Sequence, residues 1–223
     1  DGLTGAGWAE LCQVGTANAA LRDLTIANAV DVCPGQLRPL LGSGRLEGFA
    51  LRRCRASGGD QGSSLRSQWR DALCAVTGDA LRTFVVDHVD TGDAGAADVV
   101  GRLAGACPSL RRLGLSHVGA GRNVAAALIR AREAEQLPAL DALELRGNAL
   151  PPSSLSLLVA AWLPGADTSR RPGLGEFDLA DTPLDYYSVA ALAQGARRCS
   201  ALRKLVLRKC ELSAPAVSLL DDA

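Results

Sequence analysis

The segment Cys199–Cys210 reads CSALRKLVLRKC, and the spacing of its apolar residues decides the local structure. Leu205 and Leu207 are two residues apart, so a β-strand sends both side chains to one face and the residue between them to the other. Leu202 enters the same core ahead of the strand, and Cys210 turns inward where the strand ends. The segment therefore predicts a short strand with one buried face.

The same nine-residue pattern, here called the kernel, occurs seven times along the 223 residues. Apolar residues stand at its first, fourth and sixth positions, and the ninth position turns inward, although the first copy ends imperfectly in Asn28 and Ala29. The kernels start 25, 35, 29, 30, 34 and 28 residues apart, at Leu21, Leu46, Leu81, Leu110, Leu140, Leu174 and Leu202. Units repeated at this period stack on their neighbours and bury one continuous core, so the spacing predicts a solenoid.

The kernel spacing L-x-x-L-x-L-x-x-N/C, with helical segments between the copies, resembles the leucine-rich repeat family. The resemblance is to its ribonuclease-inhibitor-like and cysteine-containing classes, and its most specific parts are Cys199–Cys210 and the GDAG segment at 92–95. It implies an α/β solenoid, or horseshoe, of about seven repeats, with a parallel sheet on the concave face and helices on the convex face. It also implies that a partner protein docks on the concave face or its rim.

The chain is predicted to be a single leucine-rich repeat domain over residues 1–223, with the helix of a half-repeat in 1–19 and seven repeats in 20–223. Within the half-repeat, Trp8, Leu11 and Cys12 lie at the spacing of one buried helix face. Two insertions, residues 56–64 (ASGGDQGSS) and 164–173 (PGADTSRRPG), are predicted to be surface loops.

Composition excludes some classes of partner. The chain has 24 Lys and Arg residues and 24 Asp and Glu residues, so no net charge draws it to nucleic acid or to an anionic membrane. The apolar run Leu155–Leu163 is far too short to span a bilayer, and no secretory signal sequence is visible. We therefore expect no nucleic-acid partner and no membrane insertion.

The seven cysteines contain no C-x-x-C pair. Cys54 and Cys210 take the inward ninth kernel position, and Cys107 and Cys199 each stand three residues before a kernel. At such positions a thiol acts as a small apolar side chain, so we expect the cysteines to be buried and reduced. This favours an intracellular location in the cytoplasm, or in an organelle if a targeting segment has been removed.

No motif for a catalytic centre or a cofactor site is found, so we expect no enzyme activity and no cofactor. The histidines His88 and His117 both take the eighth kernel position, in consecutive repeats. Neighbouring strands lie about 4.8 Å apart, so these side chains are expected to stack at one edge of the sheet. Beside Asp87 or Asp90 they would form part of a metal site, or they are two solvated residues that share an exposed column; no metal ligand is assigned.

Kernel positions two, three, five, seven and eight are predicted to face solvent on the concave side. Charges there separate by strand: the sixth kernel region carries three acidic residues and no basic one, and the seventh carries four basic residues. The candidate protein-binding residues are Arg52, Asp87, His88, Arg112, His117, Glu144, Arg146, Glu176, Asp178, Asp181, Arg203, Lys204, Arg208 and Lys209.

These features favour a non-catalytic protein–protein interaction or scaffold module that is a subunit or fragment of a larger assembly. A partner is expected on the concave face and at the C-terminal end, where the last repeat leaves its core uncovered next to the basic strand. The alternative is a regulatory or substrate-recognition domain of an enzyme system, of the ubiquitin-ligase receptor or GTPase-activating type, whose other parts lie outside this sequence.

Overall fold

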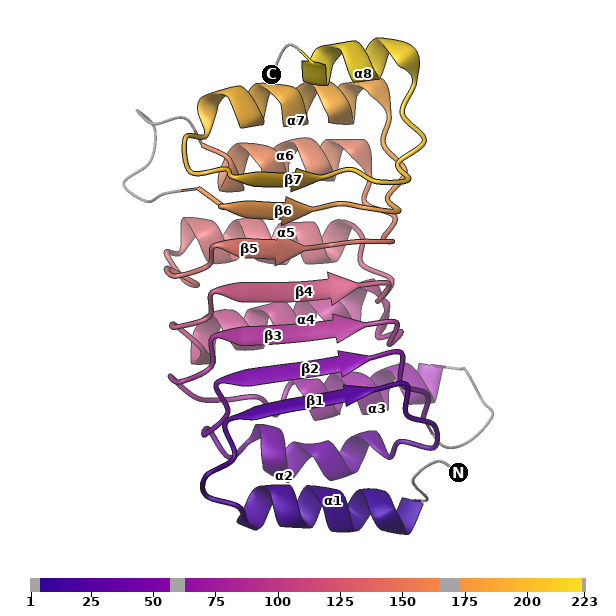
Figure 1. Cartoon of the computed structure of the whole chain (residues 1–223), viewed down its shortest axis with the longest axis vertical. Coiled ribbons are helices and arrows are strands. Elements are labelled where there is room, and N and C mark those ends of the chain that lie inside the picture. The colour runs from indigo at the N-terminus through magenta and orange to yellow at the C-terminus, as the bar shows by residue number, and fades with distance from the viewer. Residues whose placement is uncertain (1–4, 57–62, 165–172, 222–223) are drawn as a thin grey trace.

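The computed structural model describes residues 5–56, 63–164 and 173–221, and it has seven parallel strands in one sheet (Figure 1). The strands lie in chain order, so each pairs only with its neighbours in the sequence. They are β1 (Asp23–Ala27), β2 (Gly48–Arg52), β3 (Thr83–Asp87), β4 (Arg112–Ser116), β5 (Ala142–Glu144), β6 (Glu176–Asp178) and β7 (Lys204–Val206). One strand falls in each kernel, which confirms the predicted leucine-rich repeat solenoid.

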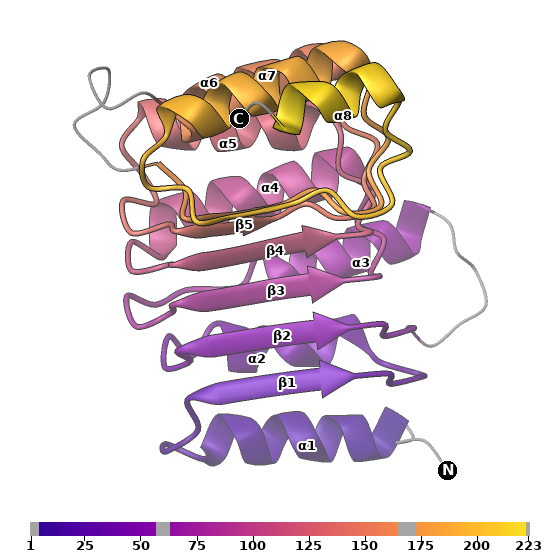
Figure 2. The ribbon, with the colours of Figure 1, turned by 45° about the horizontal axis from the view of Figure 1, so that its top comes forward.

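The helices pack behind one face of the sheet, as Figure 2 shows, and leave the opposite face open; that open face is called the concave face below. They are α1 (Gly5–Ala17), the 3-10 helix η1 (Pro34–Leu37), α2 (Arg38–Leu41), α3 (Ser63–Leu73), α4 (Gly92–Ala106), α5 (Arg122–Glu133), α6 (Pro152–Trp162), α7 (Tyr186–Arg198) and α8 (Ala214–Asp221). No helix within the described ranges is long and apolar enough to cross a membrane. Of the two predicted loops, residues 57–62 and 165–172 lie outside the described residues.

The register of the sheet aligns equal kernel positions. The fourth positions form one row, in which Leu113 pairs with Leu143 and Leu143 pairs with Phe177. Leu113, Leu143 and Leu145 are 0% exposed and Leu115 is 2% exposed, as predicted. Because each strand adds one residue to each row, the apolar rows continue through all seven repeats and form the core.

Asn148, at the ninth position of the fifth kernel, joins repeats four and five by side-chain hydrogen bonds. Its Oδ1 accepts from the backbone N–H groups of Val118 (3.2 Å) and Ala120 (2.9 Å). Its Nδ2 donates to the carbonyls of Leu115 (2.7 Å) and Leu145 (2.9 Å). The side chain is 2% exposed, so it satisfies buried backbone groups that water does not reach.

The eighth kernel residue has a left-handed backbone in all seven repeats, with φ between 51° and 65°. This turn redirects the chain from each strand toward the ninth residue, which points inward. Only one of the seven is a glycine, although side chains other than Asn, Asp or His rarely adopt this conformation. The seven residues, here called the turn column, are Asn28, Arg53, His88, His117, Gly147, Asp181 and Lys209.

Two predictions about burial are wrong in part. Trp8 and Cys12 are buried, but Leu11 is 39% exposed, because α1 packs against η1 and α2 and no described element covers its outer flank. All seven cysteines are free thiols and five are buried, but Cys33 is exposed. Burial raises the pKa of the Cys107 thiol to about 11. This buried thiol therefore stays protonated and unreactive at neutral pH.

Candidate functional site

Side chains of opposite charge pair across the strands of the concave face. Arg112 on β4 donates to Glu144 Oε1 on β5 (2.5 Å) and to Glu176 Oε2 on β6 (2.8 Å). Partial burial lowers the pKa of Arg112, but the hydrogen bonds to Glu176 and Glu144 outweigh it, and the net pKa lies above its ordinary value. Arg146 likewise donates to Asp178 Oδ2 (2.6 Å).

Some of these pairs skip a strand, because a small residue stands between the partners. Ala142 lies in register between Arg112 and Glu176 and is buried at 3% exposure, so the arginine side chain arches over it. In the same way Arg203 Nη2 reaches Asp141 Oδ2 (2.7 Å), and a Cβ on the intervening Gly175 would overlap both side chains. Long charged groups thus cover the middle of the sheet.

This cover explains why several positions predicted to face solvent are buried. A Cβ added to Gly114 would lie 3.1 Å from Val85 Cγ1 and 3.3 Å from Glu144 Oε2, which shows how closely neighbouring side chains close over the strand. The affected concave positions are Gly48, Val85, Gly114, Ser116, Ala142, Gly175 and Ala180.

The charges that separate by strand therefore form ion pairs between neighbouring repeats of the chain itself. The basic Lys204 and Lys209 of the last repeat lie 3.9 Å from Glu176 and 3.8 Å from Asp181, the acidic residues of the preceding repeat. Within the part of the chain that the structure describes, the candidate residues Arg52 and Arg208 show no such side-chain pair. From β4 to β7 the concave face is thus largely self-compensated, and its charges alone do not mark a docking site.

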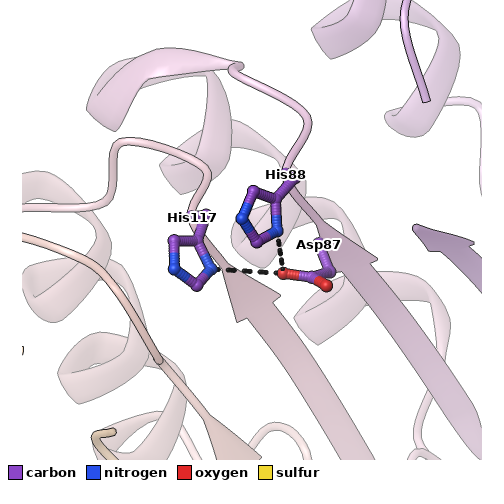
Figure 3. A group of neighbouring side chains, drawn as sticks. All are labelled: Asp87, His88 and His117. Carbon is purple, nitrogen blue, oxygen red and sulfur yellow. Dashed lines mark hydrogen bonds and ion pairs between the residues drawn. The ribbon is translucent and has the colours of Figure 1, made fainter. Parts of the chain in front are cut away.

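The predicted stack of His88 and His117 is confirmed, and Asp87 completes the group. The ring centroids are 3.9 Å apart and the ring planes differ by 19°. Each ring places Nδ1 near the same oxygen of Asp87, at 2.8 Å for His88 and 3.2 Å for His117 (Figure 3). Asp90, the other expected neighbour, instead binds Arg66 at 2.8 Å.

Parallel pairing and close packing position the two rings. Both follow strand residues that are in register, and the backbone N–H of His88 donates to Ser116 O (3.0 Å), while that of His117 donates to Arg146 O (2.8 Å). On the far side of the stack, a Cβ on Gly147 would overlap the ring of His117. The absence of a side chain at Gly147 thus makes room for the ring, and glycine also suits the φ of 65° at this position.

The rings border a groove of about 840 Å³ at the edge where β1 to β4 end. This edge groove is walled by the turns after the four strands and by α3, and its basic side chains are Arg53, Arg55, Arg66, His88 and His117. Arg66 is bound by Asp90, whereas Arg53 and Arg55 have no side-chain hydrogen bond or ion pair to any described residue. Among the groove's arginines, Arg53 stands at a repeat position in the turn column, whereas Arg55 and Arg66 follow no repeat pattern.

Comparison with known proteins does not assign the chain to a class narrower than the leucine-rich repeat solenoid. No protein-family model matches the chain, and no curated protein matches it. Among solved structures, the tropomodulin C-terminal domain from Caenorhabditis elegans is similar at 14% identity and a TM-score of 0.39, with 96% of this chain and 89% of that chain covered. The class of protein, a leucine-rich repeat solenoid, rests on the kernels, the sheet and the register described above.

Proposed function

We propose that this chain is a non-catalytic protein-interaction module, closest in design to the ribonuclease-inhibitor-like and cysteine-containing repeats, and that an acidic segment of a partner protein binds in the edge groove. The observation that carries this proposal is the contrast in charge compensation. From β4 to β7 most cations of the concave face are bound by acids of neighbouring strands, whereas Arg53 and Arg55 in the groove pair with no side chain among the described residues.

The groove suits such a segment in size and chemistry. Its volume of about 840 Å³ lies within the range of concave ligand sites, roughly 300–1,000 Å³. Arginine side chains form paired hydrogen bonds to carboxylates, and Arg53 and Arg55 give up no side-chain bond to a described residue when a carboxylate arrives. Unpaired surface cations also raise the association rate with an acidic partner more than the affinity.

Charge reversal in the groove is expected to weaken binding of an acidic probe about tenfold or more. The variant is Arg53→Glu with Arg55→Glu, and the probe is a fluorescein-labelled peptide of alternating Glu and Asp, measured by fluorescence anisotropy. The matched control reverses two exposed arginines of α5, Arg122 and Arg130.

Amide chemical shifts of the unmodified chain locate the bound peptide. Shifts confined to the turns after β1 to β4 support the proposal. Equal weakening by the control variant, or shifts centred on β7, would contradict it.

The C-terminal end of the solenoid is a second candidate surface. Leu202, Leu205 and Leu207 of the last kernel are only partly buried, although their counterparts in the fifth kernel are 5% exposed or less. Val217 on α8 is 41% exposed, and Arg208, which pairs with no described side chain, directly follows Leu207 in the sequence. We propose that this end is covered either by a further repeat of a longer chain or by a partner protein, and that a covering partner meets Arg208 with an acidic group.

Reversing Arg208 and Lys209 to glutamate is then expected to reduce co-purification of the covering partner with the tagged chain from its native cells. Lys209→Glu also disrupts the pair with Asp181, so Arg208→Glu alone is the cleaner variant. Recovery of the same complex by the Arg208 variant and by the Arg122 control would count against this surface. The ubiquitin-ligase and GTPase-activating alternatives stay predictions, because no contact of the described residues tests them.

A further inference from the structure

We propose that Asp87, His88 and His117 bind a divalent transition-metal ion of the zinc class. One ligand atom from each of the three residues lies within 4.8 Å of the other two. The group stands at the end of β3 and β4, and both histidines line the edge groove. This site goes beyond the proposed function, because it needs no partner protein and uses none of the groove's arginines.

The distances between ligand atoms already suit a shared ion. Nitrogen and oxygen ligands bind Zn²⁺ at about 2.0–2.2 Å, so neighbouring ligand atoms in a zinc site are roughly 3 Å apart. In Asp87 and the two histidines the Nδ1–Oδ1 distances are 2.8 and 3.2 Å. Figure 3 shows that both rings present their Nδ1 side to the same carboxylate oxygen. An ion that takes the place of these two contacts would find three ligand atoms near one another.

One adjustment is required. An imidazole ligand holds its metal in the plane of the ring, and two rings stacked at 3.9 Å and 19° cannot both do so for one ion. The His117 ring is confined between His88 and the backbone of Gly147, with a side chain 28% exposed. The His88 side chain is 42% exposed, so His88 is the ring that turns when the ion binds.

The backbone at the three ligand residues is already held by hydrogen bonds, so metal binding has little of the chain left to order. His88 and His117 have nearly equal φ angles of 55° and 51°, and each backbone N–H is bonded to the next strand. Asp87 is itself in the ladder of β3, opposite Ser116 of β4. The three Cα positions are therefore fixed by the sheet, and binding orders side-chain torsions alone, which reduces its entropic cost.

The ligand chemistry selects the class of ion. Imidazole nitrogen suits zinc, nickel, copper and ferrous iron, whereas calcium and magnesium prefer sites built from oxygen alone. Three protein ligands leave at least one coordination position for water or for a group of another molecule. The neighbouring Arg53 repels a cation, so the affinity depends on the negative charge of Asp87 as well as on the two imidazoles.

The test is a calorimetric titration of the reduced chain with Zn²⁺, with Co²⁺ as a spectroscopic probe. One ion per chain is expected, and His88→Asn with His117→Asn should weaken binding at least about 100-fold, beyond the 10–100-fold typical of lost supporting residues. Asparagine is chosen because it tolerates the left-handed backbone of both positions, which preserves the turn. Asp87→Asn should weaken binding as well, whereas Asp90→Asn should leave it within about threefold, since Asp90 binds Arg66.

Thiol binding is separated by its own controls. Cys33 is exposed, so Cys33→Ser should leave the affinity unchanged, and the Co²⁺ spectrum should lack the thiolate charge-transfer band. Nitrogen-15 shifts of the histidine rings should identify Nδ1 as the ligand atom.

The proposal is overturned if no ion binds at one per chain, if the double histidine variant binds as well as the parent, or if the thiolate band accompanies binding. Because the titration uses no partner, its failure leaves the edge-groove proposal standing. Failure of the peptide experiment likewise leaves the metal site standing.

Discussion

Replacing Leu143 by alanine is expected to lower the free energy of unfolding by about 2–5 kcal/mol. Leu143 lies inside the apolar row, between Leu113 and Phe177, and all three are 0% exposed. Strands on both sides and helices behind the sheet prevent the site from collapsing, so truncation leaves a cavity in addition to the lost burial. Equilibrium denaturation followed by circular dichroism measures the change.

A matched control stands in the same row. Leu205 has the same fourth kernel position on β7, but it is only partly buried because no described strand lies beyond it. Leu205→Ala should therefore cost clearly less than Leu143→Ala. An equal or larger loss at Leu205 would mean that the burial along this row is assigned wrongly.

Asn148→Leu is expected to cost about 2–4 kcal/mol, even though leucine is apolar and similar in size. The substitution leaves the N–H groups of Val118 and Ala120 and the carbonyl of Leu115 without the partner that Asn148 supplies. A buried backbone group without a partner costs roughly 1–3 kcal/mol, and local rearrangement recovers part of the sum. Thermal and denaturant unfolding give the difference.

Thr182→Val provides the comparison at the same ninth kernel position. Thr182 is 0% exposed and donates one long hydrogen bond of 3.4 Å to Ala180 O, so its loss should cost less than about 1 kcal/mol. The role of Asn148 as a tie between repeats is refuted if the two variants lose the same stability.

The fold was predictable because it depends on the spacing of apolar residues along the sequence. The spacing of Leu202, Leu205 and Leu207 fixes which residues face the core, and a repeated spacing fixes that the units stack in order. The exposure of Leu11 was not predictable in this way, because it depends on which elements lie beside α1 rather than on the periodicity of the helix.

The candidate site was predictable only where it follows the repeat. The stack of His88 and His117 follows from their shared kernel position, since the register brings equal positions together. The bond between Arg112 and Glu176 does not follow from it, because it depends on a side chain that crosses over Ala142 in three dimensions. Arg55 has no repeat position at all, so only the geometry of the loops places it in the groove.

The left-handed turn column has a consequence for how such a chain can change during evolution. Its backbone is the same whether the residue is asparagine, arginine, histidine, glycine, aspartate or lysine. Mutation can therefore alter the chemistry of one position per repeat while the architecture stays constant. The left-handed backbone costs most at Arg53 and Lys209, on the order of 1 kcal/mol, because Asn, Asp and His adopt it more readily. Any side chain placed there stands at the same edge of the sheet as its neighbours in the column, so single substitutions in successive repeats would change one continuous strip of surface.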